Sequence, residues 1–80
     1  MIIKILGSGC PNCKKVESIA REAVAEMGIT AAFEKVTDIN KILEYPIVAT
    51  PGLVIDEQLV CAGRIPHHAE VITWLEDALK

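Results

Sequence analysis

The stretch Gly7-Ser8-Gly9-Cys10-Pro11-Asn12-Cys13 decides the fold, because it separates a short apolar run from a long helical pattern. The run before it, Met1 to Leu6, is rich in isoleucine and predicts a buried strand that ends at the glycines. Those glycines allow the backbone to turn sharply and to approach the thiols or a partner closely. Pro11 suits the first position of a helix, where its missing N–H is not needed.

The two thiols of this stretch are expected on the first helical turn, with Cys10 at the helix N-terminus. Free backbone N–H groups and the macrodipole favour a negative charge there, and the thiolate is the reactive form of cysteine. Residues i and i+3 of a first turn have Cα atoms roughly 5 Å apart, inside the ~4.4–6.8 Å range of disulfides. We therefore interpret Cys10 as the exposed attacking thiolate and Cys13 as the resolving thiol. A structural metal clip and a pair of inert cysteines are the alternatives.

Size and composition predict one compact domain over residues 1–80. The chain has 80 residues, of which 51% are hydrophobic, so a small globular core is expected. The net charge of −3 and the scattered basic residues argue against nucleic acid as a partner. Only Lys14 and Lys15 are adjacent, and they predict a solvated helix face that lies near the thiols.

Membrane and export signals are not expected in this sequence. No run approaches the ~18 apolar residues that a membrane span needs. The start Met1-Ile2-Ile3-Lys4 lacks a charged segment before an apolar run, so it does not predict a signal peptide. A cytoplasmic location is the default expectation. Three cysteines in a cytoplasmic chain favour catalysis, redox sensing or metal binding over a stabilising disulfide framework.

The remaining pattern predicts an α/β fold with the order strand–helix–strand–helix–strand–strand–helix. The periodicity predicts a helix over Pro11–Met27 that ends at Gly28, and a short helix after the N-cap Asp38. Strands are predicted over Thr30–Val36, Gly52–Ile55 and Gln58–Ala62, with a hairpin turn at Asp56-Glu57, and a last helix over Pro66–Leu79. Two successive crossovers would make two parallel strand pairs, and the hairpin would add an antiparallel edge. We expect a mixed four-stranded sheet with three helices lying on both faces.

A second constellation, Ala49-Thr50-Pro51-Gly52, stands just before the third predicted strand. A proline at a strand start marks an edge, an ordinary turn or a cis bond. Taken with Cys10-Pro11-Asn12-Cys13 and the closing helix, it makes the whole chain resemble the thioredoxin superfamily. More narrowly, Gly7 to Cys13, Arg21 to Val24 and Pro51 to Asp56 resemble the small microbial proteins called redox-active disulfide protein 2.

The resemblance implies a thioredoxin-like fold without the usual N-terminal strand and helix. It implies a cis Thr50–Pro51 bond facing a Cys10–Cys13 disulfide, and Thr50 backbone groups that pair with an extended substrate segment. The substrate-binding residues would be Gly9, Pro11, Asn12, Thr50 and Pro51, with no metal or cofactor among the functional groups.

The sequence also departs from typical thioredoxins. They have tryptophan before the first cysteine and Gly-Pro between the two, whereas this chain has Gly9 and Pro11-Asn12. They carry a buried acid six residues before the first cysteine, where this chain has Lys4. The general-base role of that acid is therefore unfilled, or it is met by water or another group.

Several other residues have simpler interpretations. Cys61 is expected to pack in the core as a small apolar residue. His67 and His68 are expected in the exposed first turn of the last helix, because zinc-site spacings are not reproduced. Trp74 and Tyr45 are expected to be buried or half-buried aromatics. Arg64 is left open between capping a strand end and steering an acidic partner.

The leading hypothesis for function is thiol–disulfide exchange with disulfide-containing proteins. An external reductase would regenerate the dithiol, because Gly7-Ser8-Gly9 lacks the third glycine of a dinucleotide fingerprint and no flavin motif is present. One alternative is a soft-metal carrier or sensor that binds copper or zinc through the same two thiolates. Another is a partner-binding domain in which the cysteines are spectators.

Overall fold

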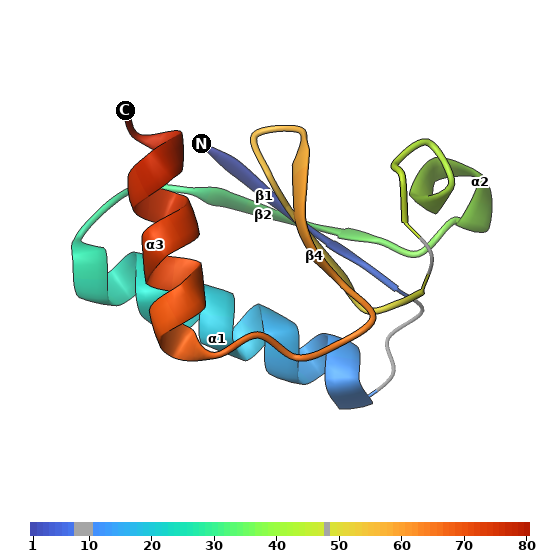
Figure 1. The fold of residues 1–80 in the computed structure, drawn as a ribbon, viewed down its shortest axis with the longest axis horizontal. Coiled ribbons are helices and arrows are strands. Elements are labelled where there is room, and N and C mark those ends of the chain that lie inside the picture. The colour runs from blue at the N-terminus through green and yellow to red at the C-terminus, as the bar shows by residue number, and fades with distance from the viewer. Residues whose placement is uncertain (8–10, 48) are drawn as a thin grey trace.

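The computed structural model describes residues 1–7, 11–47 and 49–80 (Figure 1). The strands are β1 (Ile2–Leu6), β2 (Ala32–Val36), β3 (Gly52–Ile55) and β4 (Gln58–Ala62), and the helices are α1 (Pro11–Met27), α2 (Ile39–Ile42) and α3 (His68–Ala78). The predicted bounds of α1, β3 and β4 are confirmed. The predicted strand before α2 starts later than expected, at Ala32, and α3 is shorter than predicted at both ends.

The four strands form one mixed sheet in the order β2-β1-β3-β4. β1 and β2 run parallel, whereas β3 is antiparallel to both of its neighbours. The prediction of a second parallel pair is therefore wrong. The four-residue α2 spans only about 6 Å, which is too short to carry the chain back along the sheet. β3 consequently starts at the end of the sheet where β2 finishes, and it runs in the opposite direction.

α1 and α3 cover the same face of the sheet and pack against each other (Figure 1). Inward-facing strand residues such as Ile3, Ile5 and Leu53 meet Val16 and Leu75 of these helices in the main core. Helices on both faces were expected, and among the described residues α2 is the helix that lies on the second face. Within the described residues, no helix is both long and apolar enough to cross a membrane.

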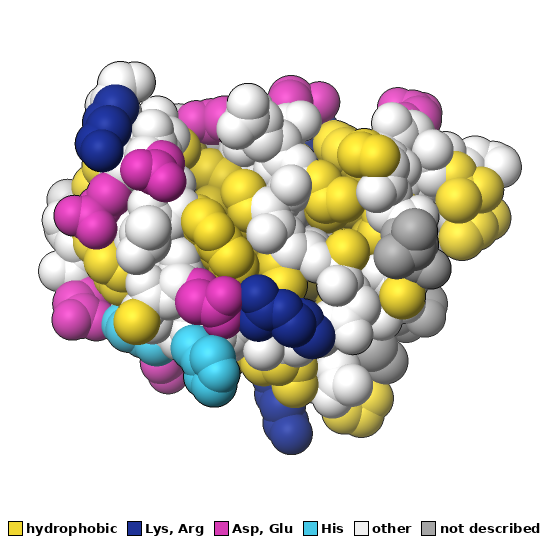
Figure 2. Space-filling view, viewed as in Figure 1, with side chains coloured by type: hydrophobic (Ala, Val, Ile, Leu, Met, Phe, Trp, Pro, Cys, Tyr) yellow, Lys and Arg dark blue, Asp and Glu magenta, His cyan; other side chains and the backbone are white. Residues whose placement is uncertain are grey.

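The second face of the sheet carries a smaller apolar cluster of Leu6, Val54 and Ile42. Tyr45 packs against it and is half-buried, as expected for this residue. Ile39, the first residue of α2, and Leu43, which follows α2, remain 60% and 64% exposed. Figure 2 shows hydrophobic side chains at the surface in this region of the molecule. This face is therefore only partly covered.

The predicted hairpin turn at Asp56-Glu57 is confirmed, and both residues have positive φ values of 47° and 69°. Non-glycine residues rarely adopt this region, so the turn needs support from its side chains. Asp56 Oδ1 accepts a hydrogen bond from Ile2 N at 2.8 Å, and Glu57 pairs with Lys4 Nζ at 2.6 Å. The turn is thus attached to β1 by two side chains.

The start of α3 is held by contacts of Glu70, and one of them involves Arg64, whose role the sequence left undecided. Glu70 accepts a hydrogen bond from the backbone N–H of His67, the N-cap residue, at 3.0 Å. The Arg64 guanidinium donates to both Glu70 carboxylate oxygens at 2.9 and 2.8 Å. Arg64 and then the His67 N–H lower the pKa of Glu70 to about 2. Arg64 therefore stabilises the segment that precedes α3, through its ion pair with Glu70.

The Glu70 contacts predict a specific acid dependence of stability. A carboxyl with a lowered folded-state pKa stabilises the fold above its unfolded value, 4.5, and loses this contribution as the pH falls toward 2. Glu70→Gln should therefore melt below wild type at pH 7, and the difference should shrink between about pH 4.5 and pH 2. Thermal unfolding across this range measures it. Glu76→Gln is the control on the same helix, since no ion pair holds its side chain within the described residues. A difference in melting temperature between Glu70→Gln and wild type that persists at pH 2 would contradict the prediction.

Candidate active site

Cys13 lies on the first turn of α1, as the sequence predicts, and only 4% of the residue is exposed. Pro11 occupies the first helical position, where no backbone N–H is required. Pro11 and Asn12 are exposed, so the buried thiol lies beneath an open turn. Cys10 and Gly9, predicted as the attacking thiol and a substrate contact, lie outside the described residues.

The thiol of Cys13 packs directly against the backbone of Gly7, the residue after β1. A Cβ atom added at Gly7 would overlap Cys13 Sγ, well inside van der Waals contact. Gly7 N donates a hydrogen bond to Val36 O at 2.9 Å, which holds this backbone segment against β2. The predicted close approach of a glycine to a thiol is therefore confirmed at Gly7.

Thr50 and Pro51 meet this group from a distant part of the sequence. The Thr50–Pro51 peptide bond is cis, as the resemblance implied. Thr50 is exposed and Pro51 is buried, and a Cβ atom at Gly7 would lie 3.8 Å from Thr50 Cβ. Pro51 O accepts a hydrogen bond from Gly63 N at 2.8 Å. The structure thus brings Cys13, Thr50 and Pro51 together at one end of the sheet.

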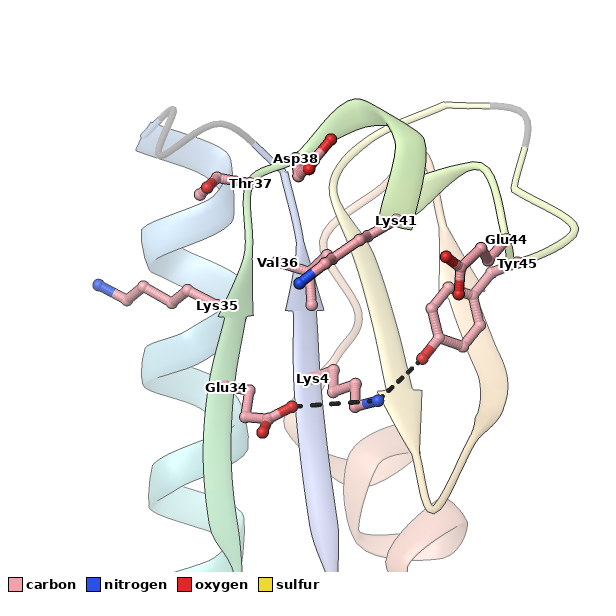
Figure 3. Close-up of a pocket in the computed structure, with 9 residues that line it drawn as sticks. All are labelled: Lys4, Glu34, Lys35, Val36, Thr37, Asp38, Lys41, Glu44 and Tyr45. Atoms are coloured by element: carbon pink, nitrogen blue, oxygen red, sulfur yellow. Dashed lines mark hydrogen bonds and ion pairs between the residues drawn. The ribbon is translucent and has the colours of Figure 1, made fainter.

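Lys4, which occupies the position of the thioredoxin acid, does not face the thiol. Its neighbours Ile3 and Ile5 point into the main core, and Lys4 points to the opposite face of the sheet. Figure 3 shows its ammonium group directed toward Tyr45 Oη, at 3.1 Å, and toward Glu34. The hydrogen bonds that Lys4 makes to Glu57 and to Tyr45 raise the pKa of the Lys4 ammonium group. Lys4 therefore stabilises the partly covered face and takes no part in the thiol site.

One cavity is lined by Lys4 and another by Cys13, and the two differ greatly in volume. The larger, about 510 Å³, lies on the partly covered face between β2 and α2, where Lys4, Lys41 and Tyr45 line it (Figure 3). The smaller, about 40 Å³, adjoins the thiol and has a mixed lining: Ile5, Gly7, Cys13, Lys14, Glu17, Lys35 and Thr37. The sequence interpretation missed Glu17 and Lys35, although the four-residue spacing from Cys13 to Glu17 is visible in the sequence.

Cys61 has the structural role that the sequence predicts. It is 7% exposed in β4 and belongs to the main core with Val71 and Leu75. Burial raises the pKa of the Cys61 thiol, which disfavours its reactive form. Its Sγ lies 3.6 Å from Arg64 O, a geometry that allows a weak hydrogen bond.

The fold and this arrangement agree with comparisons to known proteins. Residues 1–76 match the Thioredoxin domain family. The chain belongs to the thioredoxin family. A thioredoxin of Methanothermobacter thermautotrophicus is 46% identical over 71 residues, covering 89% of this chain and 92% of the relative. A thioredoxin of Methanocaldococcus jannaschii is 40% identical over 80 residues, covering the whole chain and 92% of the relative. Family membership supports a function of the thiol–disulfide oxidoreductase kind.

Proposed function

We propose that this thioredoxin-family chain reduces or exchanges disulfides of partner proteins through Cys10 and Cys13. The Cys10 thiolate attacks one sulfur of a partner disulfide, whose S–S bond breaks, and the other partner sulfur leaves as a thiolate. The Cys13 thiolate then attacks Cys10 Sγ. A Cys10–Cys13 disulfide forms, and the second partner sulfur leaves. Two electrons pass to the partner, and an external reductase restores the dithiol.

The burial of Cys13 beneath an exposed turn is the observation that carries this proposal. A thiol that is 4% exposed cannot reach a disulfide in another protein, but it can attack a sulfur three residues away. The burial of Cys13 supports its assignment to resolution, which leaves the first attack to Cys10. The chain then acts as an electron carrier between a reductase and its substrates.

The exposed residues around the thiol are proposed as the substrate surface. Pro11, Asn12 and Thr50 are exposed beside Cys13, and Gly9 joins them in the sequence. Backbone groups of Thr50 would pair with an extended partner segment, so that recognition depends little on the partner's side chains. Such a mode suits a carrier that serves several substrates.

A redox titration tests the proposed function. The protein is equilibrated in mixtures of reduced and oxidised dithiothreitol, the thiols are alkylated, and peptide mass spectrometry identifies the oxidised pair. We expect one two-electron transition that joins Cys10 to Cys13, both in wild type and in Cys61→Ala. The same protein should accelerate the reduction of insulin disulfides by dithiothreitol.

Two results would contradict the proposal. One is that no Cys10–Cys13 disulfide forms at any potential, and the other is insulin reduction at the rate of dithiothreitol alone. The metal alternative is tested on the same preparation, by measuring copper and zinc in protein purified under reducing conditions. Stoichiometric metal together with absent exchange would favour the carrier or sensor.

A further inference from the structure

The buried position of Cys13 creates a chemical requirement for the second step of exchange. A thiol must lose its proton before it attacks, and burial disfavours the charged thiolate. Because Cys13 is 4% exposed, bulk water has little access to its proton. A proton acceptor within the protein would therefore speed the resolving step.

Glu17 lines the same cavity as this thiol. Cys13 and Glu17 are four residues apart on α1, so their side chains are neighbours on one face of the helix. Both line the cavity of about 40 Å³, whose volume is sufficient for a water molecule. The Glu17 side chain is only 15% exposed, so its carboxylate is directed mainly toward the protein.

Two cations hold the Glu17 carboxylate in place. Arg21 Nε lies 2.9 Å from Glu17 Oε2, and Lys35 Nζ lies 3.2 Å from Glu17 Oε1. Figure 3 shows the Lys35 side chain pointing away from Lys4 and Lys41. Arg21 and Lys35 lower the pKa of Glu17, so its carboxylate is ionised at neutral pH, and the same two contacts make it a weaker base than a free carboxylate.

The geometry points to Glu17 as the acceptor of the Cys13 proton, through a water molecule in the shared cavity. The Cys13 S–H donates its proton to the water, which passes one to the Glu17 carboxylate. The thiolate then attacks Cys10 Sγ, the bond from Cys10 to the partner breaks, and the departing thiolate takes its proton from solvent. This inference rests on the proposed function, because it concerns the second step of that exchange.

The alternative role for Glu17 is electrostatic, and it predicts the opposite effect. A negative charge beside a thiol disfavours the thiolate, so removing the charge would make Cys13 easier to ionise. Lys14 and Lys35 also line the cavity and favour the thiolate, and Arg21 neutralises part of the Glu17 charge. Glu17→Gln should therefore accelerate resolution if Glu17 acts only through its charge. It should slow resolution if Glu17 accepts the proton.

The test follows the two steps separately with dithiobis-nitrobenzoate, a coloured aromatic disulfide, in a Cys61→Ala background. The first equivalent of coloured thiol reports attack by Cys10, and the second reports attack by Cys13 on the mixed disulfide. In Glu17→Gln we expect an unchanged first phase and a second phase slowed at least about tenfold, since positioned bases contribute ~10²–10⁴. Its rate should also rise more steeply with pH than in wild type, because hydroxide replaces the lost base.

Two variants separate the carboxylate from its surroundings. Glu22→Gln changes an exposed glutamate of the same helix and should leave both phases unchanged. Lys35→Gln breaks the ion pair but keeps the carboxylate, so its second phase should stay within a few-fold of wild type. Thermal unfolding of each variant shows that the fold is retained.

The outcomes distinguish the inference from the function on which it rests. An unchanged or faster second phase in Glu17→Gln overturns the role of Glu17 and leaves dithiol exchange intact. Equal slowing of both phases also overturns it, because that pattern indicates a distorted site. A wild-type protein that never releases the second equivalent overturns both proposals.

Discussion

Cys10→Ser is expected to reduce insulin-disulfide reduction to the rate of dithiothreitol alone. The proposed mechanism needs an accessible thiolate for the first attack, and a serine hydroxyl does not ionise at neutral pH to replace it. The two other cysteines cannot substitute for Cys10, because Cys13 and Cys61 are 4% and 7% exposed. Turbidity of the reduced insulin chains gives the rate. A Cys10→Ser protein of normal activity would show that the roles are wrongly assigned.

Cys13→Ser is the matched variant, and it should fail at a different step. Attack by Cys10 remains possible, but the mixed disulfide with the partner is no longer resolved. The covalent complex should therefore accumulate with an oxidised partner and disappear on addition of reductant. Non-reducing electrophoresis and intact mass measure the complex. Cys61→Ala should turn over normally, so that a trapped complex is specific to Cys13.

Much of the fold could be predicted because local signals agree with the tertiary structure. α1 follows from its apolar stripe between Pro11 and Gly28, and Gly28 has φ 67°, as a helix-ending glycine should. β3 and β4 follow from two short apolar runs around Asp56-Glu57. In each case the residues that form the element also mark its ends.

The direction of β3 could not be predicted in the same way. It depends on how far α2 carries the chain, and one helical turn has the same local signature as the start of a longer helix. The side of the sheet on which β3 pairs is likewise a property of the whole fold. Sequence order therefore gave the correct elements and one incorrect pairing.

The candidate site likewise contains some residues that could be predicted from the sequence and others that could not. Cys13 could be predicted from the cysteine spacing between a strand and a helix, and Thr50 and Pro51 from the resemblance to the thioredoxin superfamily. Glu17 and Lys35 resemble ordinary charged residues of a helix and an edge strand, and only the fold brings them to one cavity. Lys4 occupies the sequence position of an acid, but strand alternation turns its side chain to the opposite face.

Gly7→Ala should destabilise the protein by about 2 kcal/mol, since overpacking a dense site typically costs ~1–3 kcal/mol. The new methyl group would overlap Cys13 Sγ, while Cys13 Cβ and Thr50 Cβ, at 3.6 and 3.8 Å, are at ordinary contact distance. The sulfur is therefore the atom that must move. Thermal unfolding should show a fall in Tm of roughly 10 °C for a domain of this size.

A double-mutant cycle identifies the sulfur as the cause of this loss. In a Cys13→Ala background the clash is absent, so Gly7→Ala should cost much less there, and any backbone contribution common to both backgrounds cancels. Gly28→Ala is the matched control. No described residue lies within 4 Å of its new Cβ, so its cost is expected from the φ of 67° and should be equal in both backgrounds. Equal costs for Gly7→Ala in the two backgrounds would instead mean that the contact between β1 and the thiol does not limit the packing of this site.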